Sequence, residues 1–141
     1  MAAGLSITVV DPDEDYLGVE VAASNDRFAC SSRIFAGVAE LGEMADALAG
    51  FPDSASDIRE VELGTVDPKY AGGSVRLYFA ASDTLGHANV AIDCVDDDGR
   101  YSPGSAAFGF PVEPAGIDRF VTALRVVQSH RSGVAHLEAP S

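Results

Sequence analysis

Apolar and polar residues alternate along seven segments of this chain with a period of two, the pattern typical of β-strands with one buried face. In the first segment, 5–10, Leu5, Ile7 and Val9 share one side. Turn-forming residues such as "SND" at 24–26 separate neighbouring segments. The other six predicted strands are 17–23, 27–35, 58–66, 74–82, 87–95 and 106–112.

Two further segments have the three- and four-residue spacing of apolar positions that predicts an amphipathic helix. The first follows the third predicted strand, and Gly50 and Pro52 provide its stop signal. Gly42 inside this helix indicates a close approach to another element, because glycine is unfavourable in a helix. The second helix begins near Pro114. The apolar stripes are Val38, Leu41, Ala45 and Leu48 in the first helix, and Ile117, Phe120, Val121, Leu124 and Val127 in the second.

The resulting order, β-β-β-α-β-β-β-β-α, predicts an α+β fold. The simplest arrangement is a single antiparallel sheet of about seven strands, with both helices packed on one face and water on the other. Leu77, Ile92 and Phe110 are then expected in the core. The length of 141 residues fits one domain, which we expect over 1–130, with 131–141 as a flexible C-terminal tail.

The charge of the chain limits its partners. Nine basic against 22 acidic residues give a formal net charge of −13. Such a field repels phosphate, which argues against nucleic-acid binding, and it attracts a basic partner. A charge that serves only solubility stays open as an alternative. No apolar run reaches the ~20 residues of a membrane span, and the first residues lack the basic region of a secretory signal. We therefore expect a cytoplasmic protein that does not bind membranes.

Two acidic clusters suggest ion or partner binding. Asp11, Asp13 and Asp15 have the spacing that opens a calcium-binding EF-hand loop. Tyr16 stands where that loop requires glycine, and Ala22 stands where it requires glutamate, so an acidic turn between strands is the favoured interpretation. The second cluster, Asp96, Asp97 and Asp98, is either a solvated loop or a contact patch for a basic partner.

Catalytic signals are weak. Asp83 precedes His87 by four residues and could orient it as a general base, but the favoured interpretation is a hydrogen bond that closes a hairpin. Cys30 and Cys94 lie in apolar stretches and are expected as buried free thiols, with a mutual disulfide as the alternative. The chain has neither a G-x-S-x-G motif nor a CxxC pair. No catalytic, cofactor-binding or metal residue is therefore assigned.

The polar side of the predicted sheet is a candidate recognition surface, because tyrosine and arginine contribute strongly to protein interfaces. A solvated face of paired charges is the alternative. Gly109 in the last strand would permit close approach of a ligand or a neighbouring backbone. The candidate contacts on this face are Arg33, Arg76, Tyr78, Asn89 and Asp93.

Residues 58–127 resemble a loose group of small bacterial proteins, mostly of unknown function, that includes immunity-type proteins which neutralise polymorphic toxins. The resemblance rests on a strand, a D-x-x-G-H turn (Asp83, Gly86, His87), two more strands and a helix carrying Phe120. It implies an α+β domain without catalytic residues and with a protein partner.

Together these patterns predict a non-enzymatic, immunity-like module that binds a basic protein. The alternative is a small-molecule-binding protein or minor enzyme with a pocket on the open sheet face or under the helices. A partner-binding protein should present an acidic patch and lose affinity with salt. A ligand site should be a concave apolar pocket with a few converging polar groups. A homodimer formed through an uncovered edge strand is also expected.

Overall fold

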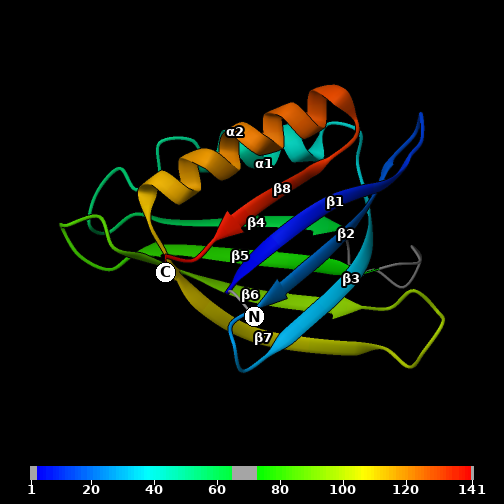
Figure 1. Cartoon of the computed structure of the whole chain (residues 1–141), viewed down its shortest axis with the longest axis horizontal. Helices are drawn as coiled ribbons and strands as arrows, with labels where there is room; N and C mark the ends of the chain where they lie inside the picture. Colours follow the sequence, from blue (N-terminus) through cyan, green and yellow to red (C-terminus); the bar gives the residue numbers. More distant parts are fainter. Residues whose placement is uncertain (1–2, 65–72, 141) are drawn as a thin grey trace.

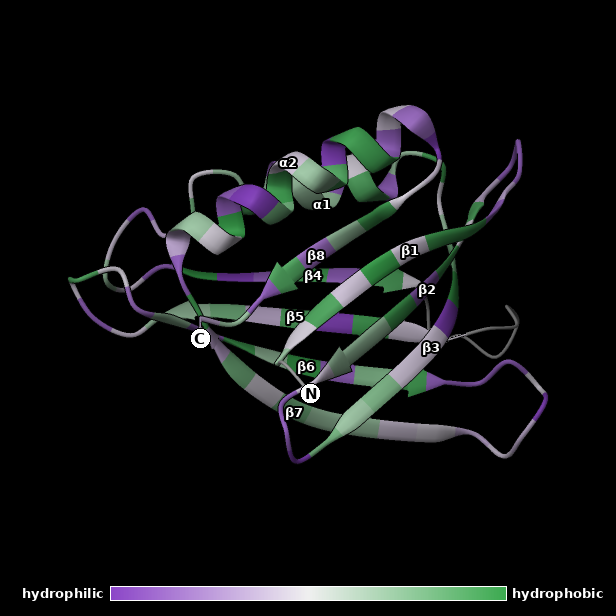
Figure 2. Ribbon diagram, in the orientation of Figure 1, coloured by the Kyte–Doolittle hydropathy of each residue, from purple (hydrophilic) through white to green (hydrophobic). Residues whose placement is uncertain are grey.

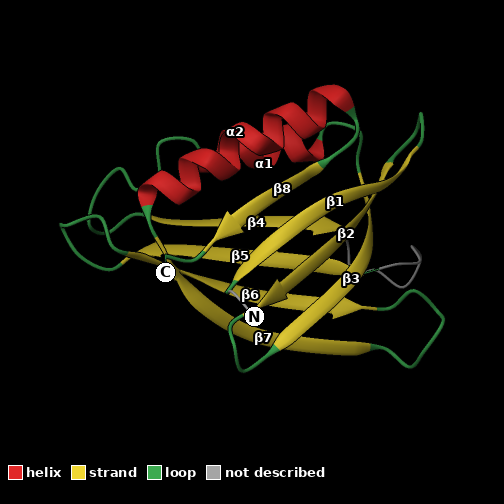
Figure 3. Ribbon diagram, viewed as in Figure 1, coloured by secondary structure: helices red, strands yellow, loops and turns green. Residues whose placement is uncertain are grey.

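The structure, a computed structural model, describes residues 3–64 and 73–140. Within these ranges the chain forms eight strands and two helices (Figures 1 and 3). The helices are α1 (Glu40–Leu48) and α2 (Pro114–His130). The strands are β1 (Gly4–Pro12), β2 (Leu17–Ser24), β3 (Ala29–Ala36), β4 (Ile58–Gly64), β5 (Ser74–Ala81), β6 (Ala88–Asp96), β7 (Gly104–Val112) and β8 (Val134–Glu138).

The strands form two four-stranded antiparallel sheets, so the expected single sheet of about seven strands is wrong, while the α+β class is confirmed. One sheet has the order β3-β2-β1-β8 and the other the order β4-β5-β6-β7. The eighth strand comes from 131–141, where we expected a flexible tail. It pairs with β1 and places Ala135 opposite Ile7. Its inward face has only two residues, Ala135 and Leu137, which is too short a pattern to recognise in the sequence.

The two sheets face each other and bury one hydrophobic cluster between them (Figure 1). Leu77, Ile92 and Phe110 are 0%, 1% and 4% exposed, so their expected burial is confirmed. Side chains of the facing sheet, such as Val19 and Ile34, belong to the same cluster. The expectation that two helices alone cover one sheet is therefore wrong. Alternation shows which residues of a strand share a face, but it does not show which strands pair.

The helices lie together along one side of the molecule, with α2 beside β8 and α1 beside β4 (Figure 3). All five predicted apolar positions of α2 are buried. In α1 Leu41, Ala45 and Leu48 are buried as expected and Met44 joins them, whereas Val38 precedes the helix and is 42% exposed. Neither helix in the described ranges is long and apolar enough to cross a membrane.

A glutamine links the two helices. The Gln128 side-chain oxygen accepts a hydrogen bond from the backbone N–H of Gly42 at 3.0 Å, and its nitrogen donates to the carbonyl of Val38. A Cβ on Gly42 would lie 3.3 Å from Cγ of Gln128. The close approach predicted at Gly42 is therefore confirmed.

On the opposite side, β3 runs directly across the strands of the other sheet (Figure 1). We call this contact the β3 seam. It consists of Cys30, Ser32 and Arg33 in β3 with Asn25 in the turn before it, and of Cys94, Val95 and Gly109 in the other sheet with Gly73 directly before β5. Hydrogen bonds between described residues cross it. They join Gly73 N–H to the Arg33 carbonyl (3.0 Å), Ser32 Oγ to the Val95 carbonyl (2.6 Å) and Asn25 Nδ2 to the Gly109 carbonyl (2.9 Å).

The interpretation of Gly109 as a position of close backbone approach is also confirmed. A Cβ there would lie only 2.6 Å from the carbonyl oxygen of Val90 in the neighbouring strand. The absence of a side chain therefore lets β6 and β7 pair closely beneath Asn25.

Candidate functional site

The two acidic clusters lie at one end of the molecule. The β1–β2 hairpin and the β6–β7 loop both project from this end, and both are strongly hydrophilic (Figure 2). Of the carboxylates in these two clusters, Asp13 and Asp96 are half-buried and the others are exposed. We call this region the acidic end, and define it by seven carboxylates: Asp11 near the end of β1 and Asp13, Glu14 and Asp15 in the following turn, and Asp96 at the end of β6 with Asp97 and Asp98 in the loop after it.

The first loop is a hairpin turn held by hydrogen bonds, so its interpretation as a turn between strands is confirmed. Asp13 Oδ1 accepts a hydrogen bond from the backbone N–H of Asp15 at 3.0 Å, and the Asp13 N–H donates to the Tyr16 carbonyl at 3.0 Å. The Tyr16 hydroxyl donates to Asp11 Oδ2 at 3.0 Å, which raises the pKa of Tyr16. The Arg131 guanidinium, from the end of α2, donates to the Asp13 carbonyl. In the described part of the chain, no three His, Cys, Asp or Glu side chains are grouped to hold a metal ion.

The second loop combines carboxylates with two exposed groups that suit recognition. Asp98 Oδ1 accepts the backbone N–H of Arg100 at 3.0 Å. The Arg100 guanidinium lies 5.5 Å from the ring centre of Tyr101, which is 74% exposed. Neither Arg100 nor Tyr101 is among the contact residues predicted from the sequence. An arginine and a tyrosine inside an acidic turn were the signal that could have identified them.

The carboxylates of the acidic end lack ion-pair partners over residues 3–64 and 73–140. The ion pairs found in these ranges all involve other acidic residues. Nearby Arg131 contacts a backbone carbonyl rather than a carboxylate. The negative charge of this end is therefore presented to solvent.

The polar contact residues predicted for one face lie on two opposite outer faces. Arg33 is on the outer face of the β3-β2-β1-β8 sheet, where its guanidinium lies 3.8 Å from Glu20. The remaining four are on the outer face of the other sheet. The expected single recognition face is therefore wrong, because the strands that carry it belong to separate sheets. Those four are Arg76, Tyr78, Asn89 and Asp93.

Most of those polar groups are already engaged within the sheet. Arg76 Nη1 donates to the Tyr78 hydroxyl at 3.3 Å and Nη2 donates to Glu62 at 3.2 Å, and these two contacts raise the pKa of Arg76. Arg76 Nε lies 3.2 Å from Glu60, but at an angle that makes no hydrogen bond. Asn89 donates to the Ser82 hydroxyl at 3.2 Å. This face matches the alternative of a solvated surface with paired charges.

His87 and Asp83 close the β5–β6 connection, as the favoured interpretation predicted. The His87 ring Nδ1 lies 2.6 Å from Asp83 Oδ2, and Asp83 Oδ1 accepts the backbone N–H groups of Leu85 and His87. This pairing raises the pKa of His87 and lowers the pKa of Asp83. The Asp83 carboxylate therefore joins the His87 ring to the backbone of the turn.

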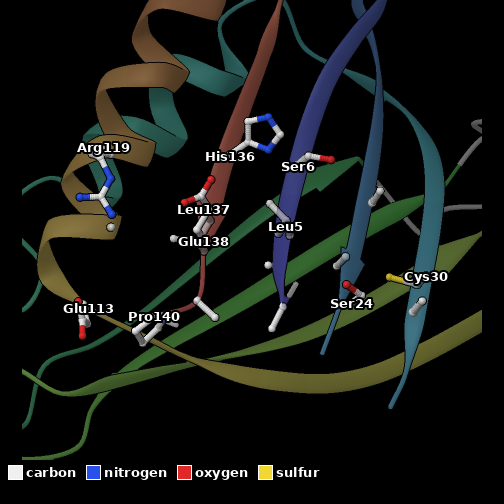
Figure 4. Close-up of a pocket in the computed structure, with 17 residues that line it drawn as sticks. Leu5, Ser6, Ser24, Cys30, Glu113, Arg119, His136, Leu137, Glu138 and Pro140 are labelled. Carbon is white, nitrogen blue, oxygen red and sulfur yellow. The ribbon is translucent and has the colours of Figure 1, made fainter. Parts of the chain in front are cut away.

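A cavity of about 800 Å³ opens where β1, β2 and β8 meet the first turns of α2 (Figure 4). Arg119, His136 and Glu138 are exposed at its rim, and Cys30 lines its other end. Much of the remaining lining consists of small residues. Its charged groups therefore lie at an open surface of mixed sign rather than converging in an apolar pocket.

A second hollow of about 560 Å³ lies between α1 and β4. Four glutamates line it, Glu40 and Glu43 from the helix and Glu60 and Glu62 from the strand. Two of them already pair with Arg76, and Glu40 accepts the backbone N–H of Gly37 at 2.6 Å.

Comparison with protein-family models, with curated proteins and with solved structures finds no match to this chain. The resemblance to immunity-type proteins therefore stays a prediction.

Proposed function

We propose that this protein is a non-enzymatic binding module that holds a basic protein partner at its acidic end. The observation that carries the proposal is that seven carboxylates, without ion-pair partners in the described ranges, lie in and beside two connections that project from the same end of the double sheet. These seven carboxylates are part of the acidic excess that gives the chain its formal net charge of −13. Such a surface steers a basic partner over long distances and fixes its orientation on contact.

The two loops supply different parts of the interaction. The hairpin is held in place by Tyr16 and Arg131, so its carboxylates are presented in a fixed arrangement. The β6–β7 loop adds Arg100 and the exposed ring of Tyr101, the residue types that dominate interface energies. The resemblance of residues 58–127 to immunity-type proteins supports the same class of function, an inhibitor that neutralises a basic protein.

A matched pair of charge variants tests the proposal. The triple variant Asp96→Asn, Asp97→Asn, Asp98→Asn removes three charges from the acidic end and changes the net charge from −13 to −10. The control variant Asp26→Asn, Asp118→Asn, Glu138→Asn removes three charges from other regions and has the same net charge. The probes are purified products of the genes next to the one that encodes this chain, with binding measured by calorimetry at low and high salt.

We expect a basic partner to bind the control variant like the wild type and to bind the acidic-end variant at least ~10-fold more weakly, which corresponds to ~1.4 kcal/mol. Binding should also weaken as salt rises, because the charges are exposed. Equal losses in the two variants, or an affinity that salt does not change, would contradict a specific role for the acidic end.

A further inference from the structure

The fold brings the two cysteines together across the β3 seam, although they are 64 residues apart in sequence. Cys30 lies on β3 opposite Ala23, and Cys94 lies on β6 between Val75 and Ala106. Two residues after Cys30, the Ser32 hydroxyl is bonded to the carbonyl of Val95 at 2.6 Å, which fixes β3 against β6 at this point. Cys94 belongs to the buried hydrophobic cluster and Cys30 packs against that cluster, and each of the two free thiols shifts the pKa of the other.

The two thiols differ in access. Cys94 is 2% exposed and belongs to the hydrophobic cluster. Cys30 is half-buried and lines the cavity of about 800 Å³, where Figure 4 shows its sulfur at the edge formed by β3. A small solute that enters the cavity can therefore reach Cys30, whereas Cys94 is shielded from solvent and does not line the cavity.

The thiols also differ in acidity. The Cys94 thiol and the backbone N–H of Ala23 lower the pKa of Cys30, against the opposing effect of burial. The pKa of Cys94 is raised by the contact with Cys30, by burial and by the charges of Asp96 and Asp93. Because the thiolate is the nucleophile, Cys30 is suited to react first with an oxidant and Cys94 to react with the product.

We propose that Cys30 and Cys94 are a redox-responsive pair that forms a disulfide between the two sheets when a small peroxide reaches Cys30 through the cavity. This proposal concerns a covalent modification site and does not depend on the binding function assigned to the acidic end.

The chemistry balances in two steps. The Cys30 thiolate attacks one oxygen of hydrogen peroxide, the O–O bond breaks, and hydroxide leaves and takes a proton to become water, which gives a sulfenic acid on Cys30. The Cys94 sulfur then attacks the Cys30 sulfur, the S–O bond breaks, and the hydroxyl group leaves with the Cys94 proton as a second water. Two thiols lose two electrons, and one peroxide is reduced to two waters. A dithiol reductant reverses the change.

The new bond would close a loop of 64 residues and restrict the unfolded chain. A loop of this size is expected to raise the Tm by roughly 10 °C. The peroxide would thus add a covalent link between the sheets to the hydrogen bonds of the seam.

The test treats the full folded chain with hydrogen peroxide and analyses it without reduction. We expect an intact mass lower by two hydrogens, a crosslinked Cys30–Cys94 peptide after digestion, and full recovery of both thiols with dithiothreitol. Melting of the oxidised protein, followed by circular dichroism, should give the higher Tm.

Two single variants separate the roles of the thiols. In Cys94→Ser the sulfenic acid on Cys30 has no partner, so dimedone should trap it, whereas the wild type should give little adduct. In Cys30→Ser the buried Cys94 should stay reduced. If Cys94→Ser fails to fold, the peptide map and melting curve of the wild type decide the question alone.

Several results would overturn the proposal. Two of them concern the product: disulfide-linked dimers through Cys30, or oxidation of Cys30 to sulfinic acid while Cys94 stays free. A third is reaction of Cys94 in the Cys30→Ser variant at the rate of the wild type. The fourth is an oxidised protein that melts at no higher temperature than the reduced protein.

Discussion

The two sheets are joined in different ways along the two sides of the molecule. Along the β3 seam the backbones come together through small and polar residues, and the Ser32 side chain is only 2% exposed while bonded to Val95. Along the helix side, α1 and α2 fill the space with large apolar side chains. The buried residues there include Phe120, Leu124 and Leu41.

The difference shows that the distance between the sheets determines which side chains fit between them. Packed sheets normally lie ~10 Å apart, a gap that large side chains fill. The Gly73–Arg33 hydrogen bond of 3.0 Å between backbones requires a much shorter approach at the seam. Only small residues fit there, and every buried polar group needs a partner. On the helix side the two helices bridge the sheets, so large apolar side chains are favoured there.

The largest effect is expected on the helix side, from Phe120→Ala. Phe120 is fully buried, and its loss should lower the free energy of unfolding by ~3–5 kcal/mol through lost burial and a cavity. Urea denaturation measures this change. Val126→Ala on the same helix is the control, because Val126 is 49% exposed and its truncation should change stability by less than ~0.5 kcal/mol. Similar losses in both variants would show that the helix side does not depend on filled volume.

At the seam, Gly73→Ala tests the opposite requirement, the absence of volume. A Cβ at this position would lie 1.9 Å from Ser32 Oγ and 2.2 Å from the Val95 carbonyl oxygen, so the sheets would have to separate. We expect a loss of ~1–3 kcal/mol in the free energy of unfolding. Gly104→Ala is the matched control in a β-strand, since nothing lies within 4 Å of the added carbon. A wild-type Tm for Gly73→Ala would argue against close packing of the seam.

A smaller effect is expected from Ser32→Ala, which removes the side-chain hydrogen bond across the seam but leaves the carbonyl of Val95 in place. The loss should be about 1 kcal/mol. Ser31→Ala provides the comparison, because Ser31 is the exposed neighbour on the other face of β3. If the two serine variants unfold at the same urea concentration, the Ser32–Val95 contact adds nothing to the seam.

The smallest effect is expected from the ion pair on the outside of the helix side. Arg125 lies 3.3 Å from Asp46 and connects α2 to α1, but the two side chains are 54% and 78% exposed. A double-mutant cycle with Arg125→Ala and Asp46→Ala should give a coupling energy of ~0.5 kcal/mol or less, which falls further with salt. A coupling above ~1 kcal/mol would mean that surface charge, and not only buried volume, joins the helices.

Much of the local structure was readable from the sequence. Strands such as 74–82 and the apolar stripe that includes Phe120 were identified because periodicity reports directly which residues are buried. The pairing of strands was not readable, because the same alternation fits one sheet or two. For that reason Arg33 and Arg76 were placed on one face, and the structure separates them.

The candidate site was predictable to a similar extent. The acidic clusters at Asp11–Asp15 and Asp96–Asp98 are contiguous in sequence, so their exposure could be inferred residue by residue. Their position at a common end depends on how the two sheets are oriented, which is long-range information. The contact between Cys30 and Cys94 has the same origin, since it arises only where β3 crosses β6.

The pairing of β8 with β1 has a consequence for how the molecule is made. The strand nearest the start of the described chain obtains its second neighbour only from the strand nearest the end, through register pairs such as Ile7 with Ala135. A ribosome must therefore release nearly all of these residues before Leu5 and Ile7 are covered on both sides. Contacts of such large sequence separation slow folding. Until β8 pairs with β1, a nascent chain would expose this apolar strand edge to chaperones.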